Sequence, residues 1–110
     1  MKGSVGAVGF KSRLLAVVAA IPKGRVCTYG TIAQHLHVTA RQVAFVLATL
    51  TAKESKQLPW FRVVAANGVV SSAKLPSVGR RQIERLRAEG IAVTPRNKVE
   101  DFHVIAWSPG

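Results

Sequence analysis

Two short helical patterns, separated by a turn of a few residues, constrain the fold of this chain most. The first is expected to run from about Thr28, whose hydroxyl suits an N-cap, to about Leu36. The second is expected over about 39–50, where apolar side chains recur at helical spacing at Val43, Val46, Leu47 and Leu50. Two such helices, the second led by a basic residue, form a helix-turn-helix pattern. Many small helical proteins share this pattern, so it does not establish DNA binding by itself.

A turn signal at Asn67-Gly68 predicts a β-hairpin after these helices. The segments 61–66 and 69–72 on either side of it have strand character, and Asn-Gly is a strong signal for a two-residue hairpin turn. A hairpin that follows a helix-turn-helix is typical of a wing. The predicted fold class is therefore mostly α with a short β-hairpin, a winged helix-turn-helix DNA-binding domain.

The other segments are expected to complete one domain, because 110 residues suffice for a single core. Residues 1–8 are expected to form a flexible, Gly-rich N-terminus, and the domain to occupy residues 9–110. The remaining expected elements are a helix from about Phe10 to Ala20, a polar loop over 52–57, a basic helix from about 77 or 79 to Glu89 that ends at Gly90, and short strands or extended segments over 91–93 and 102–107.

The charge balance indicates a polyanionic partner. The chain has 16 Lys and Arg against 5 Asp and Glu, a formal net charge of +11, and nucleic acid is the first candidate for such a surface. An anionic membrane surface is the alternative, and it would require a basic amphipathic helix with exposed large apolar residues. The sequence has no run of eighteen apolar residues, so no membrane span and no membrane partner are expected.

The cysteine and histidine content argues against a disulfide and against a metal site. The single cysteine, Cys27, excludes an internal disulfide and fits a reducing cytoplasm. Cys27 is expected to be a small buried hydrophobic residue, because no histidine lies near it in sequence to activate it. His35 and His37 are too close together for the usual zinc spacing. We therefore expect a cytoplasmic protein, nucleoid-associated if bacterial, without a metal or a cofactor.

The segment Leu58-Pro59-Trp60-Phe61-Arg62-Val63-Val64 resembles the active-site motif Pro-Cys-His-Arg-Val of the O6-alkylguanine-DNA alkyltransferases. Five further blocks resemble that family in the same order: Ile21-Pro22-Lys23-Gly24-Arg25-Val26, Thr28-Tyr29-Gly30-Thr31-Ile32-Ala33, Ala40-Arg41-Gln42-Val43, Asn67-Gly68 and Leu86-Arg87-Ala88-Glu89-Gly90. In that family the cysteine takes an alkyl group from guanine, and the histidine helps to make it a thiolate. Here Trp60 and Phe61 stand at those two positions, and neither can act as a nucleophile. The chain therefore looks like an alkyltransferase-like protein, from the non-enzymatic branch of the family.

The resemblance implies a protein that binds the minor groove and flips a damaged guanine out of the duplex. Arg41, at the start of the second helix, matches the residue that fills the gap left in the base stack. Tyr29 matches the residue that crowds the phosphate beside the flipped nucleotide. The small residues Thr39, Ala40 and Ala44 would let this helix enter the narrow groove. Without the resemblance, Arg41 would be interpreted as a solvated helix-end charge and Tyr29 as a packing aromatic.

The same resemblance implies a pocket that receives the flipped base. The residues assigned to it are Pro59, Trp60, Phe61, Arg62, Val63, Val64, Ser72 and Lys74. The face of Trp60 would hold an O6-alkyl group without removing it. Arg62 is interpreted mainly as a brace for the pocket, with direct DNA contact as the alternative. Alkyltransferase-like proteins often have an arginine after the hairpin that stacks on the lesion; Ala73 stands there in this chain, and the adjacent Lys74 would supply a cation–π contact.

The leading functional hypothesis is a non-catalytic, monomeric sensor of O6-alkylguanine in duplex DNA. It would hold the flipped base and direct the site to nucleotide excision repair proteins. The alternative is a winged-helix transcription regulator, which would bind undamaged DNA as a dimer at a specific major-groove sequence. An active alkyltransferase that uses another residue is the third hypothesis.

Overall fold

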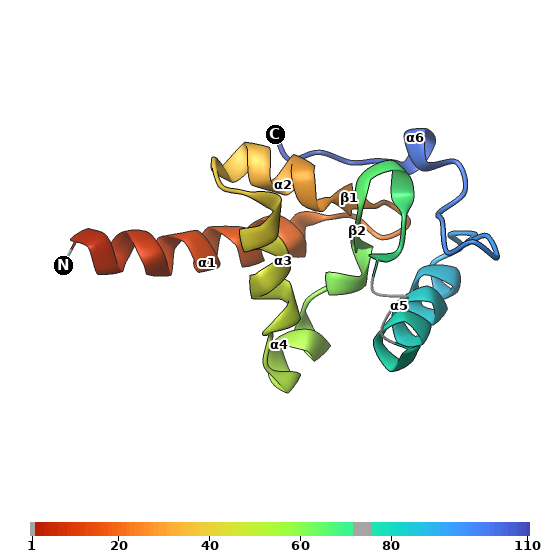
Figure 1. Cartoon of the computed structure of the whole chain (residues 1–110), viewed down its shortest axis with the longest axis horizontal. Helices are drawn as coiled ribbons and strands as arrows, with labels where there is room; N and C mark the ends of the chain where they lie inside the picture. The colour runs from red at the N-terminus through yellow and green to blue at the C-terminus, as the bar shows by residue number, and fades with distance from the viewer. Residues whose placement is uncertain (1, 72–75) are drawn as a thin grey trace.

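A parallel pair of two-residue strands, β1 (Cys27–Thr28) and β2 (Val63–Val64), joins the two halves of the chain. The computed structural model describes residues 2–71 and 76–110. The helices are α1 (Lys2–Ala20), α2 (Tyr29–Leu36), α3 (Ala40–Ala48), α4 (Ala52–Gln57), α5 (Pro76–Ala88) and α6 (Phe102–Ile105), and the 3₁₀ turns η1 (Trp60–Arg62) and η2 (Ala66–Gly68) flank β2. Figure 1 shows α1 extending away from the other elements along the longest dimension of the molecule, 48 Å. The prediction of a mostly helical domain is confirmed.

The strand pair separates two hydrophobic clusters. Successive residues of a strand point to opposite sides, so Val63 packs with Leu14 and Val18 of α1, whereas Val64 packs with Leu86 of α5. Both strand valines are almost completely buried. A fully buried valine contributes roughly 1.5–3 kcal/mol, so this short strand stabilises both halves of the fold.

The helix-turn-helix predicted from the sequence is present as α2 and α3. The Thr28 Oγ1 caps α2 by accepting a hydrogen bond from the Thr31 N–H at 3.0 Å. His37 ends α2 in the left-handed region, with φ 59°. Thr39 and Gln42 form a reciprocal capping box at the start of α3. Caps on both sides therefore fix the turn between the two helices.

The predicted two-stranded hairpin is wrong, although the chain reverses at the predicted place. Asn67 and Gly68 have φ values of 62° and 85°, as an Asn-Gly turn requires. The Ala65 N–H donates to the Val69 carbonyl across this turn at 2.8 Å. However, β2 pairs with β1 rather than with the segment after the turn. Pairing with β1 buries both faces of β2 in the two clusters, and an exposed hairpin would leave one face in water.

The N-terminal helix and the segment after α3 also differ from the predictions. α1 begins at Lys2 and so includes most of the segment 1–8, whose flexibility stays a prediction. The segment 52–57 is the helix α4 rather than a polar loop, because Thr51 and Glu54 form a capping box in which the Thr51 N–H donates to the Glu54 carboxylate at 2.9 Å. Within the described part of the chain, no helix is long and apolar enough to cross a membrane.

The C-terminal third agrees with the predictions at α5 and departs from them at α6. Gly90 ends α5 as predicted, with φ 84°, and the Ile91 N–H donates to the Leu86 carbonyl at 3.0 Å in a Schellman arrangement. Residues 102–105 form the helix α6 instead of an extended segment. After α6, Ala106 forms a parallel bridge to Val26, and in the other predicted segment Val93 forms an antiparallel bridge to Val99.

Two glycines with nearly equal positive φ values, Gly68 and Gly90, provide a test of packing around the turn η2. A Cβ at Gly68 would lie 3.1 Å from the Phe102 ring, whereas a Cβ at Gly90 would meet nothing within 4 Å. We expect Gly90→Ala to lower the free energy of unfolding by about 1–2 kcal/mol, the cost of a left-handed backbone. Gly68→Ala should lower the free energy of unfolding by about 1–3 kcal/mol more than Gly90→Ala does, because α6 must also shift. Urea unfolding measures both values, and equal losses would contradict this account of the packing.

Candidate functional site

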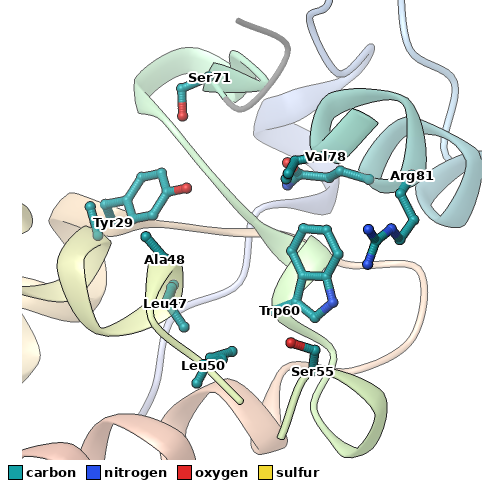
Figure 2. Close-up of a pocket in the computed structure, with 11 residues that line it drawn as sticks. Tyr29, Leu47, Ala48, Leu50, Ser55, Trp60, Ser71, Val78 and Arg81 are labelled. Carbon is teal, nitrogen blue, oxygen red and sulfur yellow. The ribbon is translucent and has the colours of Figure 1, made fainter. Parts of the chain in front are cut away.

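A cavity of about 350 Å³ opens between α3, α5 and the turn η1. Its lining residues are Tyr29, Ala44, Leu47, Ala48, Leu50, Ser55, Trp60, Ser71, Val78, Arg81 and Gln82. In Figure 2, Tyr29 and Trp60 lie on different sides of this cavity. A mostly apolar cavity with a few polar groups is the usual form of a small-ligand site.

Trp60 is held in the cavity wall by the short turn in which it lies. The Arg62 N–H donates to the Pro59 carbonyl at 3.0 Å and closes the turn η1. The Trp60 and Phe61 rings meet edge to face, with 6.1 Å between their centroids. Phe61 is buried in the cluster beneath α5, so it serves as a packing partner behind the indole. Trp60 therefore lines a cavity, with Phe61 behind it, and the binding of a flipped base in this cavity stays a prediction.

Arg62 and Glu89 form a partly buried ion pair that fixes this turn to the rest of the fold. Their side chains are 15% and 9% exposed, and the Arg62 Nε donates to both Glu89 oxygens at 3.0 and 3.1 Å. The Arg62 Nη1 donates to the Ile21 carbonyl at 2.7 Å, and the Gly24 N–H donates to Glu89 Oε1 at 3.1 Å. These bonds connect η1 with the chain that follows α1 and with the end of α5. This geometry agrees with the interpretation of Arg62 as a brace.

The environment of Glu89 favours its charged form. Burial raises the pKa of the Glu89 carboxyl, but hydrogen bonds from Arg62 and from the Gly24 N–H outweigh burial and hold this pKa below its usual range. An ionised Glu89 therefore stabilises the fold at neutral pH.

A second brace, Gln82, was not predicted from the sequence. Gln82 is 2% exposed, and its side-chain amide donates to the carbonyls of Phe61 and Val63 at 3.0 and 2.9 Å. It lies on the inner face of α5, one helical turn before the buried Leu86. The sequence signal for this role is a polar residue on the apolar face of the helix. Gln82 attaches the segment containing Trp60 to α5.

The other predicted pocket residues lie in different places. The side chains of Val63 and Val64 are buried in the two clusters and do not line the cavity. Pro59 is partly buried and lies next to the lining rather than in it. Ser72 and Lys74 lie outside the described residues. A contact of any of these residues with a bound base stays a prediction.

The predicted DNA-facing residues lie on the helix-turn-helix. Tyr29, the first residue of α2, is half-buried and lines the cavity. Arg41 is exposed in the first turn of α3, next to Ala40, which is also exposed. Ala44, one turn further on, is exposed and lines the cavity, so α3 connects the Arg41 surface with the pocket. Thr39 is occupied by the cap, where its Oγ1 accepts from the Gln42 N–H at 3.1 Å.

Cys27 is poorly suited to nucleophilic chemistry. Its side chain is 1% exposed and belongs to the cluster around α1 and α2, as the sequence predicted. Burial raises the pKa of the Cys27 thiol to about 11, against a weaker lowering by a hydrogen bond with the backbone of Thr28. A neutral buried thiol is not a nucleophile at physiological pH.

Comparisons with known proteins agree with this arrangement. Residues 9–91 match the family described as 6-O-methylguanine DNA methyltransferase, DNA binding domain. The DNA base-flipping protein of Vibrio parahaemolyticus is 38% identical over 105 residues, which cover 91% of this chain and 97% of the relative. The alkyltransferase-like protein 1 of Schizosaccharomyces pombe is 33% identical over 86 residues, which cover 76% of this chain and 78% of the relative. A crystal structure of S. pombe Atl1 with damaged DNA containing O6-carboxymethylguanine matches with a TM-score of 0.78 and 29% identity, and covers 93% of this chain and 97% of that one.

The Arg62–Glu89 pair predicts a specific acid sensitivity. The stabilisation from Glu89 is complete above the ordinary glutamate pKa of about 4.3, and it is lost as the pH falls through the lower pKa of the folded protein. Glu89→Gln should lower the free energy of unfolding by about 3 kcal/mol at pH 7, and should flatten its decline between about pH 5 and pH 3. Urea unfolding across this range measures both effects.

Glu84→Gln provides the matched control, because Glu84 is exposed on the same helix. This variant should keep the stability and the acid profile of the unaltered protein. An acid profile for Glu89→Gln that parallels that of Glu84→Gln would contradict the assigned role of the pair.

The burial of Cys27 predicts slow thiol chemistry. With a pKa of about 11, the folded protein should react with a thiol reagent at pH 8 at least about a hundredfold more slowly than the same chain in urea. Following the reaction by absorbance in both conditions checks this expectation. Similar rates would show that the thiol is accessible and ionisable in the folded state.

Proposed function

The chain belongs to the 6-O-methylguanine DNA methyltransferase DNA-binding family, in its alkyltransferase-like branch. We propose that it is a non-enzymatic sensor of O6-alkylguanine in duplex DNA. One observation carries the proposal. Trp60 stands where the family has its acceptor cysteine, and its side chain lines the cavity. The chain's only cysteine, Cys27, is buried elsewhere. In this proposal the cavity receives the base, and neither Trp60 nor the buried Cys27 accepts its alkyl group.

Recognition of the lesion requires the base to leave the helical stack, at a cost of a few kcal/mol. The exposed Arg41 on α3 supports a role in filling the vacated position, because its planar guanidinium can stack between bases and donate hydrogen bonds. Tyr29 lines the cavity from α2, where it would direct the displaced nucleotide inward. The net charge of +11 would attract the phosphate backbone. Entry through the minor groove is supported by the small exposed residues Ala40 and Ala44.

We also propose that the protein acts as a cytoplasmic monomer and directs the site to nucleotide excision repair. A pocket without a nucleophile leaves the alkyl group on the guanine, so another protein must remove the lesion. The bound protein would mark the site for that step.

A binding titration tests the proposal. A duplex with one O6-methylguanine should bind about tenfold or more tightly than the same duplex with guanine, and affinity should fall with salt. Arg41→Ala should weaken binding to the damaged duplex about tenfold. Arg96→Ala removes the same charge from the loop that follows α5 and should have a much smaller effect. Fluorescence anisotropy measures all of these affinities.

Two results of this experiment would contradict the proposal. Equal affinities for the damaged and undamaged duplexes would exclude a lesion sensor, and selection of a sequence consensus from random undamaged duplexes would then support a transcription regulator. Transfer of the alkyl group to the protein, detected by its mass after incubation with the damaged duplex, would show that the chain is an enzyme.

A further inference from the structure

Arg81 places a positive charge in the wall of the cavity. It lies on α5, directly before the buried Gln82, and its side chain is exposed. Arg81 and Trp60 both line the cavity, and in Figure 2 the guanidinium group of Arg81 points toward the indole. In the described part of the chain, ion pairs join Lys11 to Glu54 and Arg62 to Glu89, and none involves Arg81.

The charge of Arg81 is not balanced within the cavity. Of the described residues that line it, Arg81 is the only one with a charged side chain, and none is acidic. Val78, which lies beside Arg81 in Figure 2, and the lining residue Leu50 are both apolar. An anionic ligand group that enters the cavity would meet this guanidinium, and no acidic side chain among the described lining residues would compete for it.

The place of Arg81 relative to the lesion rests on the proposed function. In this family the acceptor cysteine meets the substituent on O6, because it takes the alkyl group. Trp60 stands at that position here. The O6 substituent of a flipped guanine would therefore lie against Trp60, on the side of the cavity that contains Arg81.

We propose that Arg81 makes the pocket selective for O6-alkylguanines whose alkyl group ends in a carboxylate. The planar guanidinium can donate two parallel hydrogen bonds to a carboxylate, a stronger interaction than it can form with a neutral group of the same shape. Trp60 supplies an apolar surface to any alkyl group, and Arg81 distinguishes the charged adduct from the neutral one. The chain would thereby favour carboxymethyl-type damage over neutral alkyl damage.

Three duplexes that differ at one base test this selectivity. They contain guanine, O6-carboxymethylguanine, or O6-(carbamoylmethyl)guanine, in which a neutral amide replaces the carboxylate at nearly the same size. The unaltered protein should bind the carboxylate adduct about fivefold more tightly than the amide adduct. Arg81→Gln should bring this ratio close to one while it keeps a preference for both adducts over guanine. Arg81→Lys should keep part of the ratio, because it keeps the charge but not the planar donor pair.

Arg80→Gln is the matched control, because Arg80 is exposed on the same helix and does not line the cavity. It should weaken binding to all three duplexes equally and leave the ratio unchanged. Equal binding of the two adducts by the unaltered protein would overturn the selectivity, as would a ratio that survives in Arg81→Gln. Equal binding of all three duplexes would overturn the proposed function itself, and this inference with it.

Discussion

The ion pair between Arg62 and Glu89 is the interaction on which the candidate site depends. It joins the turn η1 to the end of α5, and each partner also bonds to the backbone that follows α1, at Ile21 and Gly24. Trp60 begins that turn, so the Arg62–Glu89 ion pair sets the position of its indole. A buried pair of this kind contributes little net stability but is costly to break. It therefore fixes the geometry of the site more than it strengthens the fold.

The hydrogen bonds of Arg62 and Gln82 explain how the cavity can keep its shape when the residue at position 60 changes. The bonds that position η1 come from Arg62 and Gln82, and neither depends on the side chain at position 60. A reactive residue at that position can be exchanged for a large aromatic one while the surrounding backbone stays in place. The result is a mostly apolar cavity with an indole surface and with the charge of Arg81 on its wall.

Local signals in the sequence predicted much of the fold. The Thr28 cap, the reversal at Asn67-Gly68 and the end of α5 at Gly90 all follow from nearby residues, and all are present. The capping box of Thr51 and Glu54 is equally local, but the polar composition of 52–57 predicts a loop where α4 forms. Other features depend on contacts between distant parts of the chain. The pairing of β2 with β1 joins two distant segments, and the positions of Gln82 and Arg81 beside the cavity depend on the packing of α5 against η1. Periodicity in the sequence encodes neither contact. The place of Trp60 in the pocket was predicted through family resemblance.

The proposed function requires that a damaged guanine leaves the duplex and comes to rest against Trp60. The chain has two tryptophans, so Trp107→Phe leaves Trp60 as the only source of indole fluorescence. The most direct measurement is the emission of this variant when it is saturated with an O6-methylguanine duplex and, separately, with the matched guanine duplex. Stacking of a flipped base should quench Trp60 much more strongly in the damaged complex. Equal quenching at saturation by the two duplexes would contradict the claim that the base enters this pocket.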